Sequence, residues 1–170
     1  QSLKFKKMKI PKFDKSIDDR LSKNKWSIIK KKPDVIIFEG WCVGARHEKK
    51  STLKNSINQL EKNEDGNMVW RNTVNSELKN NYLKLFKKIN YLVYLKIPSF
   101  KYVIKWRSLQ EKKLKGKTKG KKIMNNNQIL RFIMFYERIT KNMIKNISKI
   151  ANILISLDSK HRLKRLSIKL

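Results

Sequence analysis

The stretch on which the expected fold depends is Asp34-Val35-Ile36-Ile37-Phe38-Glu39-Gly40. A short apolar run with β-branched residues stands here between Pro33 and Gly40, which is typical of a strand. No polar residue interrupts the run, as expected of a strand that is buried on both faces of a parallel sheet. We therefore predict a buried strand here, with the carboxylate of Glu39 at its C-terminal end.

Helical and strand patterns alternate along the rest of the chain. Apolar residues at helical spacing predict helices over residues 52–62, 70–89, 100–114 and 127–149. Short apolar runs predict two further strands, over Tyr91–Ile97 and Ile153–Leu157. This alternation favours a single α/β domain over residues 1–170 with a mainly parallel sheet.

The chain is strongly basic. Its 170 residues include 43 Lys and Arg against 13 Asp and Glu, which gives a formal net charge of +30. Such a balance suggests a nucleic acid or an anionic membrane as partner. However, the excess is mostly Lys and comes with many Asn and Ile, whose codons are all AT-rich. We therefore prefer a compositional origin of the charge, and keep a nucleic-acid-binding protein as an alternative.

Features of compartment and chain length also follow from the sequence. Cys42 is the only cysteine, which excludes an intrachain disulfide and fits a reducing compartment such as the cytoplasm. No apolar run approaches the roughly 20 residues of a membrane span. The chain starts at Gln1 without an initiator Met, so we expect a longer native chain of which this is the C-terminal part.

Glu39 is the first candidate for chemistry. Ligands of open α/β sheets bind beyond the carboxyl ends of the strands, where this carboxylate is expected. A carboxylate there can hold Mg²⁺ directly or through water, as phosphoryl transfer requires. Gly40 would let the backbone turn sharply after it. The alternative interpretation is a glutamate that is simply exposed at the end of a strand.

A second candidate is the charged loop that contains Asp14, Asp18, Asp19 and Arg20. Its carboxylates can orient a substrate hydroxyl or bind a metal through water. Arg20 can bind a substrate carboxylate through two parallel hydrogen bonds. A capping turn with a local ion pair explains the same residues equally well.

Two basic stretches invite a phosphate-binding interpretation. Arg107, Lys112, Lys113 and the loop 115–122 could form a cationic lid, although a solvated helix face is the alternative. Residues 44–51 nearly match the phosphate-loop pattern G-x-x-x-x-G-K-[ST]. Lys49 occupies the second glycine position, where a Cβ obstructs the backbone wrap around phosphate, so we interpret this match as fortuitous. His47, His161 and Cys42 have no partners at metal-ligand spacing.

Several segments resemble, in order, the motifs of the D-glycerate 3-kinase family. Residues 13–20 are similar to its F-D-K-x-x-D-D-R loop, and residues 38–45 to its F-E-G-W-x-x-G signature. Trp106-Arg107 with Gln110-Glu111 resembles its lid-arm helix. Residues 136–140 resemble the helix after the lid, and residues 151–158 the last strand. The resemblance extends from about Ile10 to Arg162.

The resemblance implies a P-loop-kinase-like three-layer α/β fold and phosphoryl transfer from ATP with Mg²⁺ to a small hydroxyl substrate. Glycerate is the leading candidate. A lid-like segment is implied over about residues 107–127. The implied roles are catalysis by Glu39 and Asp14, with Glu39 also at Mg²⁺; substrate binding by Asp18, Asp19 and Arg20; and nucleotide or phosphate binding by Gly40, Arg107, Lys113 and Arg138.

One departure from the family pattern concerns the phosphate loop, which the family carries upstream of its F-D-K segment. We therefore expect the N-terminal strand, phosphate loop and helix to be missing from this sequence. Either the chain is part of a longer kinase, or it is a non-catalytic kinase remnant that acts as an interaction module.

Overall fold

The computed structural model describes residues 5–14, 19–115 and 124–169. The chain forms two compact units, residues 1–39 and residues 40–170. The single domain that the sequence favours therefore stays a prediction. None of the helices within the described ranges combines the length and the apolar character needed to cross a bilayer.

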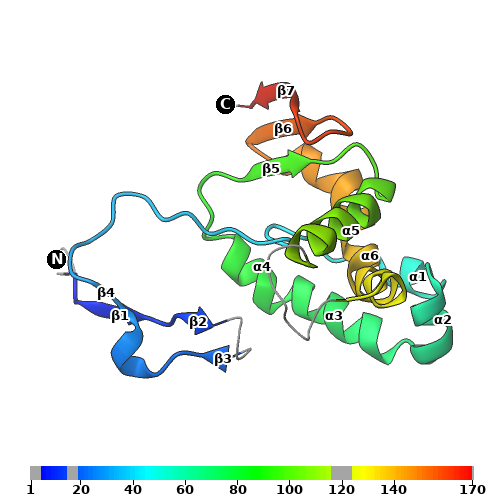
Figure 1. Ribbon diagram of the computed structural model, residues 1–170, viewed down its shortest axis with the longest axis horizontal. Helices are drawn as coiled ribbons and strands as arrows, with labels where there is room; N and C mark the ends of the chain where they lie inside the picture. The colour runs from blue at the N-terminus through cyan, green and yellow to red at the C-terminus, as the bar shows by residue number, and fades with distance from the viewer. Residues whose placement is uncertain (1–4, 15–18, 116–123, 170) are drawn as a thin grey trace. The chain divides into compact units, whose positions relative to one another are not determined.

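The first unit consists of two short hairpin-like pairs (Figure 1). β1 (Met8–Ile10) pairs antiparallel with β4 (Ser27–Ile29), and β2 (Phe13–Asp14) pairs antiparallel with β3 (Asp19–Arg20). The 3-10 helix η1 (Lys23–Lys25) lies between β3 and β4 in the sequence. The half-buried Trp26 indole donates to the Leu21 carbonyl at 2.7 Å, which ties the end of η1 to the residues before it.

The strand predicted over residues 34–40 is not formed in this structure. Residues 35–39 are extended without ladder partners among the described residues, and Val35, Ile36 and Ile37 are 75–86% exposed. The predicted burial is wrong as well, and the physical reason is that a strand needs a neighbour to satisfy its backbone groups and cover its side chains. No described segment provides that neighbour.

The sheet of the second unit has the order β5-β6-β7. β5 (Val93–Lys96) and β6 (Ile153–Leu157) are parallel, and β7 (Leu163–Ile168) returns antiparallel to β6. The two strands predicted in this half of the chain are thus confirmed. A mainly parallel sheet is not confirmed, because the other described ladders are antiparallel.

The helices of the second unit surround one long helix (Figure 1). The predicted helices over 100–114 and 127–149 are present as α5 (Lys101–Lys115) and α6 (Asn126–Ile150). The predicted helix over 52–62 is instead α1 (Lys50–Leu53) and α2 (Gln59–Glu64). The one over 70–89 is α3 (Val69–Lys79) and α4 (Asn81–Phe86), because Asn80 leaves the helical conformation at φ −106° and ψ −82°.

α6 organises the hydrophobic core. Its first turn is closed by a capping box in which Asn125 and Gln128 satisfy each other's backbone N–H groups. Met143 and Ile147 pack with Leu78 of α3 and with Ala45. Gly44, which precedes Ala45, adopts a φ of +80° that is unfavourable for residues with a side chain. A glycine at this position therefore allows the turn that brings Ala45 into the core.

Candidate functional site

The hairpin β2–β3 brings three of the candidate residues together. Asp14 and Asp19 are partners in the antiparallel register, and Arg20 is the partner of Phe13. Asp14 is half-buried, whereas Asp19 and Arg20 are exposed. Directly opposed residues of an antiparallel pair have Cβ atoms about 4.5–5.5 Å apart. The two carboxylates therefore lie on one face of the hairpin, whereas the Arg20 side chain starts from the opposite face, because successive side chains of a strand alternate. Asp18 lies outside the described residues.

Glu39 and Gly40 lie at the boundary between the two units. The Glu39 carboxylate is exposed at the end of the extended segment, and Gly40 begins the turn that follows it. The Gly40 carbonyl accepts a hydrogen bond from Val43 N at 3.5 Å. A Cβ at position 40 would lie 3.1 Å from Val43 Cγ2, so glycine allows this turn to stay tight.

Arg107 on α5 lies at the contact between α5 and α6. Its guanidinium donates to Gln110 Oε1 at 2.6 Å and pairs with Glu111 Oε1 at 2.5 Å. The same guanidinium lies 5.3 Å from the ring centroid of Phe132 on α6, at cation–π distance. Its Nε is buried and has no hydrogen-bond partner among the described residues. Arg107 is therefore held in one orientation with an unused donor.

Aromatic rings continue this contact on α6. Trp41 stacks on Tyr136 with centroids 4.8 Å apart and an interplanar angle of 16°. Phe132 lies between Arg107 and this pair, 5.2 Å from the Tyr136 ring. Trp41, which follows Glu39-Gly40 in the sequence, thus packs against α6, the helix that also contacts Arg107 through Phe132. Lys113 is exposed on α5 beyond the buried Glu111.

Trp106, the residue before Arg107 on α5, contacts the hairpin formed by β6 and β7. Trp106 Nε1 donates to the Ser159 carbonyl at 3.4 Å, and the Trp106 ring lies 3.6 Å from that of His161. Asp158 orders this turn by accepting from the backbone N–H groups of Lys160 and Arg162. Donation from Arg162, first from its backbone and then from its side chain, lowers the pKa of Asp158 to about 2.

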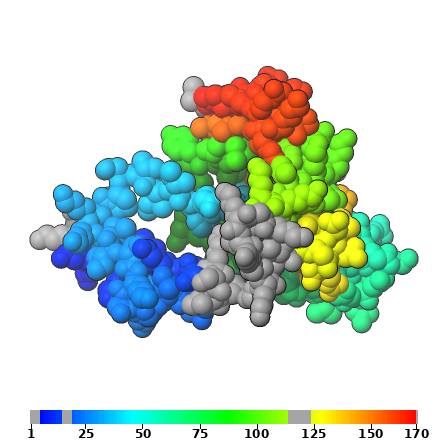
Figure 2. Space-filling view, in the orientation of Figure 1, coloured from blue at the N-terminus to red at the C-terminus, as the bar shows by residue number. Residues whose placement is uncertain are grey.

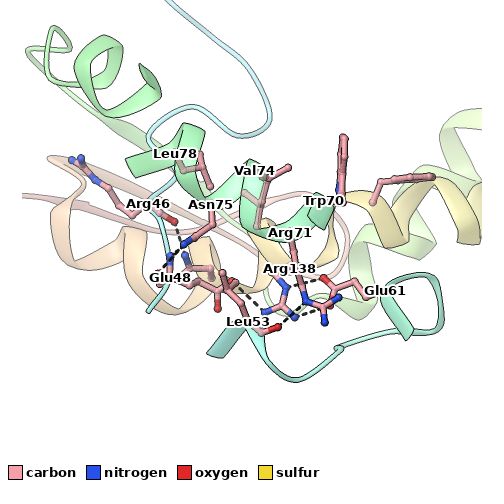
Figure 3. A pocket seen from close by; sticks show the side chains of 13 residues that line it. Arg46, Glu48, Leu53, Glu61, Trp70, Arg71, Val74, Asn75, Leu78 and Arg138 are labelled. Carbon is pink, nitrogen blue, oxygen red and sulfur yellow. Dashed lines mark hydrogen bonds and ion pairs between the residues drawn. The ribbon is translucent and has the colours of Figure 1, made fainter. Parts of the chain in front are cut away.

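Arg138 lies in a buried ionic cluster on the inner side of α6 (Figure 3). It donates from Nε and Nη2 to the two carboxylate oxygens of Glu61 at 2.7 and 2.6 Å. Further bonds reach the carbonyls of Asn55 at 2.7 Å and Thr52 at 3.3 Å. Glu48 Oε1 lies 3.6 Å from Nη1. These contacts engage all three nitrogens of the guanidinium.

The cluster borders a cavity of about 30 Å³, which is large enough for a water molecule rather than a substrate (Figure 3). Burial by itself would raise the pKa of Glu61, but hydrogen bonds from Arg138 and from Ile57 N–H, together with the charges of Arg138 and Arg71, hold that pKa below its ordinary value. Arg71 forms a second buried pair with Asp65 at 3.0 Å. The glutamate is therefore an anion at neutral pH and fixes Arg138.

Sequence reasoning missed the partners of Arg138 in this cluster. Glu61 and Glu48 precede Arg138 by long stretches of chain, and no periodic pattern connects them with it. The usable signal concerned Arg138 alone, because residues 136–140 belong to the segments that resemble the kinase family. Within the described ranges, no group of three or more His, Cys, Asp and Glu side chains is arranged to hold a metal ion.

Two solved structures superpose on this chain over nearly its whole length. D-glycerate 3-kinase from Cryptococcus neoformans superposes with a TM-score of 0.72 and 20% identity over 96% of this chain and 60% of that one. The chain has the fold of D-glycerate 3-kinase. The YGR205w protein matches with a TM-score of 0.67 and 22% identity over 96% of this chain and 58% of that one.

Sequence comparison points the same way. The uncharacterized kinase mug58 of Schizosaccharomyces pombe is 32% identical over 134 residues, which is 75% of this chain and 46% of the relative. No family model matches the chain. All three similarities fit the D-glycerate 3-kinase family, so the resemblance indicated by the motifs is confirmed. The chain spans about half the length of this curated relative.

Proposed function

We propose that this chain takes part in ATP-dependent phosphoryl transfer to a small hydroxyl substrate, with glycerate as the leading candidate. The observation that carries the proposal is the β2–β3 hairpin, which pairs Asp14 with Asp19 and adds Arg20 in a chain with the glycerate kinase fold. A 2,3-dihydroxy acid offers hydroxyls for the paired carboxylates and a carboxylate for the Arg20 guanidinium, whose long side chain has to reach around the edge of the hairpin to meet it. This complementarity supports glycerate over an uncharged sugar alcohol.

Asp14 is the proposed general base. A carboxylate within hydrogen-bond reach of the acceptor hydroxyl takes its proton as the oxygen bonds to the γ-phosphorus of ATP. The bond from that phosphorus to the bridging oxygen breaks, and ADP leaves with the electron pair. Arg20, assisted by Asp19 and by Asp18 outside the described residues, orients the substrate through its carboxylate. Asp14 and Arg20 thereby divide proton removal and positioning between them.

The nucleotide side of the proposal uses Glu39, Gly40, Arg107 and Lys113. An exposed carboxylate is the hard oxygen ligand that Mg²⁺ prefers, so Glu39 fits as its ligand, directly or through water. When bound, Mg²⁺ neutralises the charge that develops on the transferred phosphoryl group. The exposed ammonium of Lys113 suits phosphate oxygens. The Arg107 guanidinium has the charge for the same role, but its Nε is buried and its Nη atoms contact Gln110 and Glu111, so it would have to release these partners first. Gly40 keeps the backbone beside Glu39 free of a side chain.

For Arg138 we propose a different role from the phosphate binding that the family resemblance implied. Its nitrogens are engaged by Glu61, Glu48 and two carbonyls, which favours a positioning role over direct contact with phosphate. By joining α6 to α2, it fixes the helix on which Phe132 supports Arg107. The lid-like segment over about residues 107–127 includes residues 116–123, which lie outside the described part of the chain.

The phosphate loop is proposed to come from polypeptide outside these 170 residues. Residues 44–51 do not replace it, since Lys49 is a lysine where a glycine is required and Gly44 packs against Leu92 and Ile147 in the interior. The single cysteine fits a cytoplasmic location for the complete protein.

The test is a phosphoryl-transfer assay with D-glycerate, ATP and Mg²⁺ on the longest native polypeptide that contains this sequence, and in parallel on the 170-residue chain. We expect activity in the longer polypeptide, a drop of about 10²–10⁴-fold in Asp14→Asn, and a raised KM for glycerate in Arg20→Gln. Lys9→Gln on β1 is the matched control and should leave the rate unchanged. Full activity in Asp14→Asn would refute the assigned base, and absence of transfer to any hydroxy acid would refute the function.

A further inference from the structure

A group of lysines lies where β1 begins and β4 ends in the first unit. In the antiparallel ladder of these strands Met8 is the partner of Ile29. Carried one residue beyond the ladder, the same register brings Lys7 opposite Lys30. Two further lysines follow Lys30 in the sequence, and one precedes Lys7. We call this group the lysine cluster; its members are Lys6, Lys7, Lys30, Lys31 and Lys32.

The lysine cluster presents cations on both faces of the β1–β4 pair. Successive side chains of a strand alternate, so Lys7 and Lys30 lie on the face of Ile28, whereas Lys6 lies on the opposite face. All five residues are exposed, in the unit that Figure 2 shows in shades of blue. Within the described ranges none of the five forms an ion pair with a carboxylate. Their ammonium groups are therefore open to an external anion.

Composition explains how many lysines the chain has, but not how this unit separates its charges. The cluster comes from two segments, residues 5–12 and 21–32, that contain several lysines and no acidic residue. The carboxylates that the structure describes in this unit lie outside both, on β2–β3 and in the segment after Pro33. Like charges directly opposite each other destabilise a strand pair, so placing Lys7 opposite Lys30 costs stability unless an anion binds there.

We propose that the lysine cluster binds the phosphate backbone of a nucleic acid strand without reading its sequence. The phosphates follow one another regularly, so a strand that passes over this end of the β1–β4 pair meets several ammonium groups at once. Each such contact releases condensed counterions, which drives sequence-independent binding. Lysine suits this contact because its ammonium is a point charge on a flexible stem. The inference does not rest on the proposed phosphoryl transfer, in which none of the five lysines takes part.

Two other anionic partners fit the lysine cluster less well. A bilayer surface is flat, so it meets the cations of one face and leaves either Lys6 or Lys7 unpaired. The carboxylates of an acidic protein are matched best by the planar guanidinium of arginine, which the cluster lacks. A nucleic acid strand is flexible and evenly charged, so it can follow cations from one face to the other.

The experiment measures binding of a fluorescent single-stranded thymidine 20-mer to the 170-residue chain by fluorescence anisotropy. A thymidine 20-mer with uncharged methylphosphonate linkages is the comparison probe, since it keeps the bases and removes the backbone charge. We expect saturable binding of the charged 20-mer only, with a log Kd that rises linearly with the logarithm of the salt concentration. A glutamate 20-mer and vesicles of phosphatidylserine with phosphatidylcholine represent the two other partners.

Two fivefold variants of equal net charge locate the binding site. The cluster variant combines Lys6→Gln, Lys7→Gln, Lys30→Gln, Lys31→Gln and Lys32→Gln. The control variant makes the same change at exposed lysines of the second unit, with Lys54→Gln, Lys62→Gln, Lys79→Gln, Lys84→Gln and Lys88→Gln. We expect the cluster variant to weaken binding at least about tenfold, and the control variant less than about threefold. At about 0.7 per lost phosphate contact, the cluster variant also lowers the salt slope by up to about 3.5.

A third variant separates charge from folding. It has arginine at the five positions of the lysine cluster, which keeps the charge, and we expect its Kd to stay within about threefold of that of the unchanged chain. The five positions lie outside the β1–β4 ladder, so neither replacement removes a ladder hydrogen bond. An arginine variant that binds as weakly as the cluster variant shows that charge at these positions does not hold the strand, and overturns the proposal.

Each remaining outcome also overturns the proposal. Equal weakening in the cluster and control variants shows that net charge alone, and thus composition, drives binding. Absence of binding, or equal binding of the methylphosphonate 20-mer, excludes a contact with backbone phosphates. Tighter binding of the glutamate 20-mer or of the vesicles, lost in the cluster variant, assigns the lysine cluster to an acidic protein or to a membrane surface instead.

Discussion

Replacing Arg138 by methionine tests the buried cluster that holds α6 to α2. Methionine preserves an apolar stem but removes the guanidinium, so the Glu61 carboxylate loses both of its charge-assisted bonds, at 2.7 and 2.6 Å. The two side chains are 11% and 8% exposed, so water cannot replace the lost donors easily. Removing one partner from a buried ion pair costs about 3–5 kcal/mol of unfolding free energy, which we expect for Arg138→Met.

The same two helices provide a matched control. Arg131 on α6 makes a bidentate ion pair with Glu64 on α2, in which Nη2 donates to Oε2 at 2.8 Å. Both side chains are 50% exposed. An exposed pair contributes about 0–1 kcal/mol, so Arg131→Met should cost no more than that. Residue types and helices are alike in the two pairs, so the comparison sets the buried cluster, with its further bonds from Arg138 to Asn55, Thr52 and Glu48, against an exposed pair.

The assay is urea unfolding at pH 7, followed by circular dichroism at 222 nm. This signal reports the second unit, since the first contains strands and a 3-10 helix but no α-helix in its described residues. Glu61→Gln and the double variant complete a mutant cycle, and a coupling energy of about 1 kcal/mol or more is expected for groups in direct contact. If Arg138→Met costs no more than Arg131→Met, the cluster does not stabilise the unit and Arg138 becomes available again as a phosphate ligand.

Two further predictions concern the same unit. Because the pKa of Glu61 is held below its ordinary value of 4.5, its ionisation stabilises the folded state above that pH, and this stability is lost as the pH falls through the lower folded value. The free energy of unfolding in urea should therefore fall less steeply between pH 5 and 3 for Glu61→Gln than for the unchanged chain. Equal slopes would contradict the assignment. Gly44→Ala forces alanine to a φ of +80° and places a Cβ 3.1 Å from both Leu92 δ-carbons, so we expect a loss of about 1–2 kcal/mol or more in thermal unfolding. Gly66→Ala, whose Cβ would meet nothing nearer than the Lys62 carbonyl oxygen at 3.9 Å, is the control and should change stability less; an equal loss in both would show that local strain at Gly44 is not the cause.

The local pattern of the sequence was sufficient to predict much of the secondary structure of the second unit. α6 carries an apolar stripe in which Ile129, Ile133, Met143 and Ile147 recur on one side, and this spacing defines both the helix and its buried face. The apolar runs of β5 and β6 likewise predicted strands. The order of motifs around Glu39, Trp106 and Tyr136 indicated the kinase family before any fold was known. These properties depend on residues close together in the chain.

Contacts between distant segments were decided by the tertiary structure. Arg138 is 77 residues from Glu61, and Trp106 is 53 residues from Ser159, so no local pattern could pair them. Local pattern likewise failed to predict the helix break at Asn80 and the absence of a strand in the described residues directly after Pro33. A helix can form from its own hydrogen bonds, whereas a strand requires a neighbour. The sequence alone therefore determined which segments favour burial, and the fold decided which of them found a partner.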